Sequence, residues 1–154
     1  MAIDIGLTDA ARTSSAEALK VLLGETYGLY NKTHGYHWNV TGPRFNELHG
    51  MFMTQYNELW LALDLIAERI RALGHFAPGS SAEILEHATI KPDKGVPEAS
   101  EMVKNLAAGH EAVSKAAKAG IRIGEKNNDP VSVDLFTQRA QIAEKTAWML
   151  RASV

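Results

Sequence analysis

Two histidines are spaced so that their side chains could meet across a helical hairpin. His37 lies five residues before Gly42, and His49 lies six residues after Pro43. Gly and Pro both favour a turn. Nearly equal distances from that turn put the two imidazoles at the same height on antiparallel helices, where they can face one another. The two histidines are therefore candidate metal ligands.

Two acidic residues further along the second helix are the candidate partners of the histidines. Asp64 and Glu68 are four residues apart, so both carboxylates lie on one helical face. Asp64 follows His49 by fifteen residues, which is about 22 Å of helical rise with a rotation of about 60°. One ion cannot bridge that gap, but a two-fold axis near Tyr56 would bring His49 of one chain to the acids of a second copy. The geometry predicts two metal sites per dimer, each shared between subunits.

The ligand set limits which metal fits such a site. Imidazole and carboxylate suit iron, manganese or zinc, whereas copper(I) and iron–sulfur clusters call for thiolates, and the sequence has no cysteine. Carboxylate oxygen also favours Fe(III) over Fe(II), which helps oxidation once iron is bound. A second interpretation remains open: the histidines could be packing groups of the hairpin, and the two acids could pair with Arg69 or Arg71 on a solvated face.

Apolar periodicity and capping signals predict four long helices and one short helix. Their expected ranges are 13–38, 44–73, 81–88, 97–128 and 129–154. The first is expected to begin at Thr13–Ser15, because Glu17 follows Ser14 in capping-box spacing. The second should end at Gly74, a natural C-cap. We therefore predict an all-α four-helix bundle with a short extra helix in the connection between its second and third long helices.

Composition and charge restrict the possible functions. The length of 154 residues, without a long Gly-, Ser- or Pro-rich linker, predicts one domain over residues 1–154. Neither a signal peptide nor a membrane-spanning stretch is recognised, so a cytoplasmic protein is expected. The formal net charge is −2, and the first nineteen residues hold one basic residue, Arg12. Direct DNA binding is therefore not expected.

Three stretches of the sequence resemble the signature of the Dps family, the DNA-protection-during-starvation proteins or mini-ferritins. They are His37–Pro43 with Phe45, Leu48 and His49; Asp64–Gly74; and, near the end, Glu144–Lys145 with Trp148–Ala152. The resemblance covers nearly the whole chain and implies a ferritin-like fold assembled from two-fold dimers into a hollow shell of twelve subunits. Such a shell would bind iron between subunits, oxidise Fe(II) with hydrogen peroxide or oxygen, and store ferric mineral.

Carried over by position, the resemblance implies the ligands that the spacing had suggested. His37 and His49 would come from one subunit, and Asp64 and Glu68 from its neighbour. One position departs from the family pattern, because Met53 stands where the family usually has an acidic residue one turn after the second histidine. A thioether is a weak ligand for iron, so packing of Met53 against the partner in the dimer is favoured over coordination. We expect one iron position to be weakened and oxidation to be slower or more dependent on peroxide.

The resemblance also implies roles for three residues outside the ligand set. Trp38 follows a candidate ligand and is expected first to pack as an anchor of the hairpin; the resemblance implies that it could also donate an electron. Asp129 and Asp134 match the region that lines the family's three-fold pores, where carboxylates would concentrate cations. Asp129 is also an ordinary residue before a helix start, so a capping role remains open.

Two other functions are compatible with a helical bundle. One is DNA compaction by a protein with weak or lost ferroxidase activity, but the basic tail that this would need is missing. The other is a di-iron enzyme acting on organic substrates, whose bundle usually supplies Glu-x-x-His pairs from two helices. No Glu-x-x-His occurs in this sequence. Iron oxidation and storage therefore remain the leading hypothesis.

Overall fold

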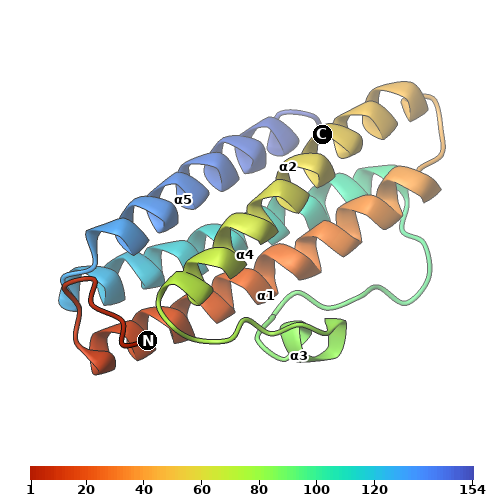
Figure 1. Cartoon of the computed structure of the whole chain (residues 1–154). Helices are drawn as coiled ribbons and strands as arrows, with labels where there is room; N and C mark the ends of the chain where they lie inside the picture. The colour runs from red at the N-terminus through yellow and green to blue at the C-terminus, as the bar shows by residue number, and fades with distance from the viewer.

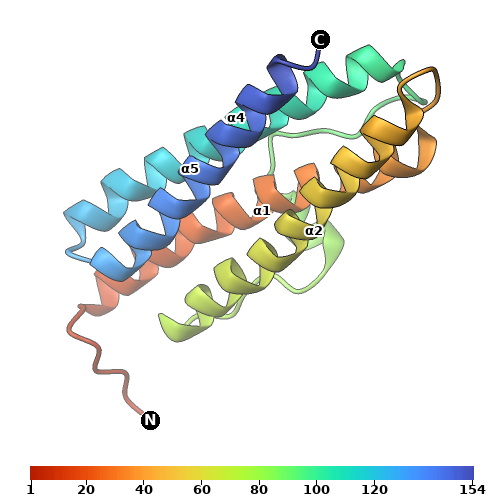
Figure 2. The same cartoon turned by 90° about the horizontal axis from the view of Figure 1, so that it is seen from above.

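The computed structural model describes residues 1–154, which form five helices. They are α1 (Asp9–Asn39), α2 (Phe45–Ala72), α3 (Ser81–Leu85), α4 (Ala99–Lys126) and α5 (Pro130–Arg151). Two antiparallel hairpins, α1–α2 and α4–α5, are joined by a long connection that carries α3 past α1 (Figure 1). Because α1 also packs along α4, the hairpins form one bundle (Figure 2). The predicted all-α bundle with a short extra helix is confirmed.

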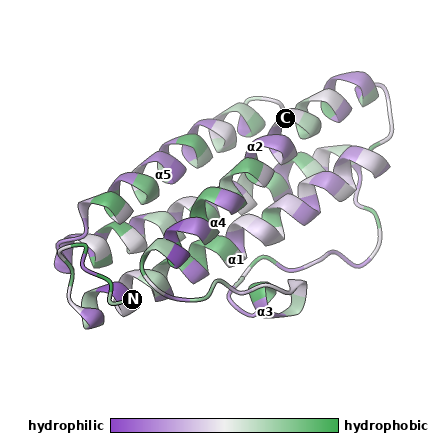
Figure 3. Cartoon of the chain, viewed as in Figure 1, coloured by the Kyte–Doolittle hydropathy of each residue, from purple (hydrophilic) through white to green (hydrophobic).

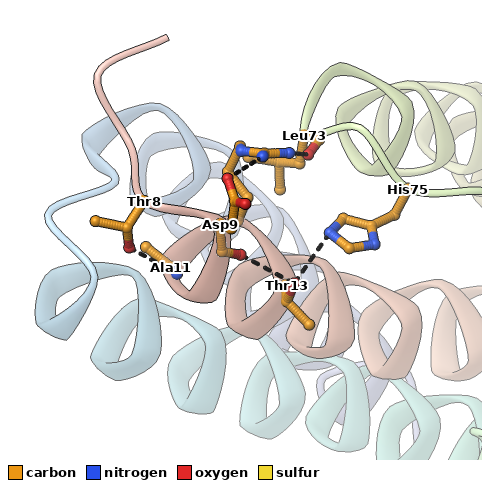
Figure 4. Close-up of polar contacts among 7 residues, drawn as sticks. Thr8, Asp9, Ala11, Thr13, Leu73 and His75 are labelled. Carbon is orange, nitrogen blue, oxygen red and sulfur yellow. Dashed lines mark hydrogen bonds and ion pairs between the residues drawn. The ribbon is translucent and has the colours of Figure 1, made fainter. Parts of the chain in front are cut away.

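The first helix begins earlier than the sequence predicted. The N-cap is Thr8 rather than Ser14, and its hydroxyl accepts a hydrogen bond from the N–H of Ala11 at 3.1 Å (Figure 4). Arg12 donates to the carbonyl oxygen of Leu73 at 2.9 Å, which ties the first turn of α1 to the end of α2. The predicted start was wrong because Thr8, and not a hydroxyl of Thr13–Ser15, caps the helix, and the contact of Arg12 with Leu73 stabilises this additional turn.

The end of α2 and the start of α5 lie where the sequence predicted. Gly74 adopts a left-handed conformation with φ 91°, and its N–H donates to the carbonyl of Arg71, so it terminates α2. The side chain of Asp129 caps α5, and Pro130 occupies its first turn. None of the helices is both long and apolar enough to cross a membrane.

A buried carboxylate anchors the connection between α2 and α4. Glu25 of α1 is almost fully buried, and its two oxygens accept the N–H groups of Thr89 at 2.7 Å and Ile90 at 3.3 Å. A buried carboxylate is costly unless it is hydrogen-bonded, and here the backbone supplies the partners.

The short helix ends at Leu85 rather than at Ala88 as predicted. Its last turn tightens instead, because the N–H groups of His87 and Ala88 donate to the carbonyls of Ile84 and Leu85, three residues back.

The long helices share one core of 25 buried apolar residues. Apolar and polar segments alternate along each long helix (Figure 3), as expected for helices that bury one face. Gly120 of α4 permits a close approach of α5, since a Cβ there would come within 2.5 Å of the Phe136 ring. Arg139 of α5 joins the two hairpins by donating to both carboxylate oxygens of Glu58 of α2, at 2.6 and 2.7 Å.

A buried histidine of α4 predicts how stability depends on pH. His110 is 2% exposed and neither ring nitrogen has a partner. Burial lowers the pKa of His110 from 6.5 to about 4, and the charge of Arg139 acts in the same direction. The pKa of His110 is lower in the folded state than in the unfolded state. The stability that the neutral His110 contributes is therefore present above pH 6.5 and is lost as the pH falls towards 4.

We expect protonation of His110 to lower the free energy of unfolding by about 2 kcal/mol between about pH 7 and about pH 5. Urea unfolding of the wild type and His110→Met, at one protein concentration, measures this contribution as the difference between their pH dependences. The same pH dependence in both proteins would contradict the prediction.

Candidate metal centre

The tip of the α1–α2 hairpin brings His37 and His49 into direct contact. Their rings stack with centroids 3.8 Å apart and planes 15° from parallel. The turn between the helices passes through Gly42, whose φ of 111° is rarely adopted by residues with a side chain. The structure thus places the two imidazoles at the same height, as their spacing predicted.

Each imidazole is held by the backbone of the other histidine. Nδ1 of His37 donates to the carbonyl oxygen of His49, and Nδ1 of His49 donates to the carbonyl oxygen of His37, both at 2.7 Å. The carbonyl of His37 is free to accept because it lies in the last turn of α1. A carbonyl only accepts, so both Nδ1 atoms carry the proton and both Nε2 atoms keep a lone pair. This is the tautomer of a metal-binding histidine whose second nitrogen is anchored by a carbonyl.

The acidic residues lie on α2, away from the histidines and free of partners. Asp64 and Glu68 are exposed, and neither forms a hydrogen bond or an ion pair within the chain. The alternative in which they pair with neighbouring arginines is wrong. Arg69 donates to the side chains of Asp129 and Ser132, whereas Arg71 donates to a backbone carbonyl and lies over an aromatic ring. Two carboxylates, one helical turn apart, therefore remain available to a ligand.

No single chain assembles a complete site. Within one copy, no group of three or more His, Asp or Glu side chains lies close enough to hold a metal ion. The structure brings the two histidines together and leaves Asp64 about 22 Å and Glu68 about 28 Å further along α2 than His49 by helical rise. A metal site that uses all four side chains therefore needs a second copy of the chain.

The surface around the acids is unusually apolar for a solvated helix. Trp60, Leu61 and Leu65 are all more than half exposed. Beside Asp64 runs a groove whose other lining residues are Leu23, Tyr27, Trp60, Leu61, Leu63, Ala67, Pro78 and Ile84. Contiguous exposed apolar surface of this kind marks an interaction site.

Two large apolar residues near the histidines are exposed in the single chain. Trp38 is 66% exposed, so it does not anchor its own hairpin as predicted, although its ring centroid lies 4.2 Å from that of His34. Met53 is also exposed and lies one turn after His49. The electron-donor role of Trp38 stays a prediction.

The two acids predicted for a pore have different surroundings. Asp129 is 1% exposed and accepts hydrogen bonds from Arg69 at 2.8 Å and from the N–H of Ser132 at 3.0 Å. Burial alone would raise the pKa of Asp129, but the hydrogen bonds from Ser132 and the charge of Arg69 lower it. The capping role of Asp129 is confirmed. Asp134 is exposed and bonded to Gln138, and a pore role for either acid stays a prediction.

Comparison with known proteins agrees with this architecture. A family model of the ferritin-like domain matches residues 16–154. An uncharacterized low temperature-induced protein of Nostoc is 38% identical over 154 residues, covering 99% of this chain and 86% of that protein. DNA protection during starvation protein 2 of Bacillus anthracis is 34% identical over 136 residues, covering 88% of this chain and 93% of that protein. This chain belongs to the Dps family.

A solved Dps structure shares the fold over its full extent. The Dps protein from Vibrio cholerae O1, described as a member of a broad superfamily of ferritin-like diiron-carboxylate proteins, superposes with a TM-score of 0.92 at 30% identity. The match covers 99% of this chain and 96% of that chain. The predicted ferritin-like fold of this Dps chain is therefore confirmed.

The hydrogen bonds that orient the histidines could not be predicted from the sequence. Their acceptors are backbone carbonyls, which every residue carries, so no residue type marks them. The aromatic neighbours did leave a signal, because Tyr27, Tyr30, His34 and His37 recur at three- and four-residue intervals on one face of α1.

The hydrogen bonds predict the tautomer of both candidate metal-binding histidines. His37 and His49 should carry their proton on Nδ1, because each Nδ1 faces a carbonyl oxygen that can only accept. Solid-state NMR of protein with ¹⁵N-labelled histidine distinguishes the two forms by the shifts of the ring nitrogens. A proton on Nε2 of His37 or His49 would contradict the metal-ready geometry.

Proposed function

We propose that this chain is a cytoplasmic ferroxidase subunit that oxidises Fe(II), with hydrogen peroxide as the preferred oxidant, and stores the ferric product in a cage of twelve subunits. Its iron sites would form across a two-fold axis, with His37 and His49 from one subunit and Asp64 and Glu68 from the other. The observation that carries this proposal is the pair of imidazoles whose Nδ1 atoms are both anchored by carbonyls, leaving two adjacent Nε2 lone pairs.

The two halves of such a site would make different contributions. The Nε2 atoms bind the incoming Fe(II), since neutral imidazole suits this ion. The carboxylates of Asp64 and Glu68 add negative charge, which stabilises Fe(III) relative to Fe(II) and so favours loss of an electron. Neither acid is neutralised by an arginine of its own chain, so both charges are available to the site.

The apolar surface of α2 supports a partner that is a second copy of this chain. A two-fold axis near Tyr56 would bring the histidine half of each chain to the acidic half of the other. It would also cover the exposed Trp60, Leu61 and Leu65, whose burial provides the driving force for association. Residues that supply a metal site and residues that supply the contact would then lie on the same face.

Protection of DNA, from which several relatives take their names, does not require contact with DNA. A protein that consumes Fe(II) and peroxide together removes the two reagents that generate hydroxyl radicals. The formal net charge of −2 offers no general attraction to phosphates. Protection by chemistry therefore fits this chain better than protection by compaction.

Mixing two inactive variants tests whether sites are shared. His37→Ala/His49→Ala lacks every imidazole ligand, and Asp64→Asn/Glu68→Gln lacks every carboxylate ligand, so each variant alone should oxidise almost no Fe(II) with peroxide. Refolded together, mixed dimers regain one intact site. Random pairing of equal amounts should therefore restore about a quarter of the wild-type sites.

The readouts of this experiment are Fe(II) binding, the rate of ferric absorbance after peroxide addition, and the size of the mineralised particle. The double variant Glu47→Gln/Glu101→Gln, with two exposed acids outside the site, is the control and should behave as wild type. Full activity of either ligand variant alone, or no recovery on mixing, would contradict the proposal.

Substitution of Met53 by an acidic residue should strengthen iron binding at the proposed site. Met53→Glu places a carboxylate one turn after His49, where it adds a hard ligand for iron. We expect Fe(II) affinity to rise about tenfold, equivalent to one additional charge-assisted contact of about 1.4 kcal/mol, and oxidation by oxygen to accelerate. Met53→Leu is the matched control and should leave both unchanged. Equal affinity of the Glu and Leu variants would show that this position lies outside the site.

A further inference from the structure

Aromatic side chains form a continuous file along the contact between α1 and α2, which we call the aromatic tract. Its members, in spatial order, are His49, His37, Tyr56, His34, Tyr30 and Trp60. The centroids of successive rings lie 3.8, 5.2, 4.0, 5.6 and 5.6 Å apart. No gap in the file exceeds the separation of rings in van der Waals contact.

The two ends of the tract coincide with the two halves of the proposed metal sites. One end is the histidine pair, and the other is Trp60, one helical turn before Asp64. His49 and Trp60 are eleven residues apart on α2, which is about 16 Å of helical rise. In the proposed dimer the histidines and acids of one chain belong to different iron sites, so the tract of each chain runs from one site to the other.

Reduction of hydrogen peroxide needs more electrons than one Fe(II) can supply. Reduction of hydrogen peroxide to two hydroxide ions takes two electrons, whereas oxidation of one Fe(II) to Fe(III) supplies one. With Met53 in place of an acid, a second iron at the same site lacks a ligand. A site that holds one iron must therefore obtain its second electron from elsewhere.

We propose that the aromatic tract supplies this second electron and connects the two iron sites of a dimer, an inference that rests on the proposed function. One Fe(II) and one ring of the tract each give an electron to hydrogen peroxide, which yields Fe(III), a ring radical and two hydroxide ions. Fe(II) at the other site then reduces the radical. In total, two Fe(II) and one peroxide give two Fe(III) and two hydroxide ions, and the tract returns to its starting state.

The rings of the tract have the properties that these steps require. Indole and phenol are the side chains most readily oxidised by one electron after thiols, and the sequence has no cysteine. Tyr56 and Tyr30 are direct neighbours with centroids 6.4 Å apart, and Tyr30 in turn neighbours Trp60. Tunnelling slows steeply with distance, so short steps between such rings are much faster than one transfer over the whole span.

A hydrogen bond links the hydroxyl of Tyr30 to an imidazole that can take up its proton. A phenol loses its proton when it is oxidised, and the hydroxyl of Tyr30 lies 3.1 Å from Nδ1 of His34. The imidazole can hold that proton and return it when the phenoxyl radical is reduced. His34 also stacks on Tyr56 and lies 4.2 Å from Trp38 by ring centroids, so it links the phenols to an indole beside the histidine pair.

Two tryptophans, one inside the tract and one outside it, allow a direct test. In the single chain Trp60 is 58% exposed and Trp148 of α5 is 60% exposed. Because the proposed dimer covers Trp60, oxidant from solvent reaches Trp148 more easily, so an excess of oxidation at Trp60 points to the tract. The wild type is supplied with less than one Fe(II) per dimer and excess peroxide, so that no second iron can repair the ring radical. Mass spectrometry of peptides should then find Trp60 oxidised several-fold more than Trp148, and this excess should disappear when both sites are filled with Fe(II).

Variants that preserve ring packing test the path itself. Tyr30→Phe/Tyr56→Phe removes both oxidisable phenols of the tract but keeps the rings. We expect the excess oxidation of Trp60 to vanish, spin-trapped hydroxyl radical to rise several-fold, and less Fe(III) to form per peroxide. Tyr27→Phe removes a phenol that neighbours Tyr30 without lying between the two ends, and should behave as wild type.

The results separate this inference from the proposed function. If Fe(II) is oxidised by peroxide but Trp60 and Trp148 are damaged equally, or if the double variant matches the wild type, the tract carries no electrons and the ferroxidase proposal stands. If the wild type does not oxidise Fe(II) with peroxide, both are overturned. Selective damage at Trp60 that depends on the two phenols supports the relay.

Discussion

The reciprocal hydrogen bonds between His37 and His49 are the constraint on which the candidate site depends. Each ring nitrogen reaches the carbonyl of the other residue at 2.7 Å, which is possible only because α1 and α2 lie antiparallel with a short turn at Gly42. The core beneath them holds that geometry through fully buried Leu48 and Phe52. Packing of the hairpin therefore decides the tautomer of both imidazoles, and through it the atoms presented to a metal.

The acidic half of the site depends on a different part of the bundle. Arg69 follows Glu68 directly and could have neutralised it, yet its guanidinium is bound to Asp129 and Ser132 at the start of α5. The helix cap of α5 thereby keeps an arginine away from the candidate ligands. This arrangement connects the α4–α5 corner to the charge available on α2, and explains why Asp129 is buried rather than solvated.

The sequence predicted those features that follow from local spacing and missed those that follow from tertiary contacts. Distances from the Gly42–Pro43 turn were enough to place His37 opposite His49, and Gly74 was enough to end α2. The start of α1 was missed because Thr8 caps a turn that the contact of Arg12 with the carbonyl of Leu73, a residue far along the chain, stabilises. The positions of the imidazole protons could not be predicted either, because their acceptors are backbone carbonyls, which every residue carries.

The use of backbone acceptors has an evolutionary consequence. No substitution at a neighbouring position can delete a carbonyl oxygen. The orientation of the two imidazoles can therefore be lost only through mutation of the two histidines themselves or of residues that shape the hairpin. The ligands themselves are side chains and have no such protection. Variation in reactivity within this fold should therefore arise from exchange of ligand side chains, as at Met53, rather than from loss of the backbone acceptors.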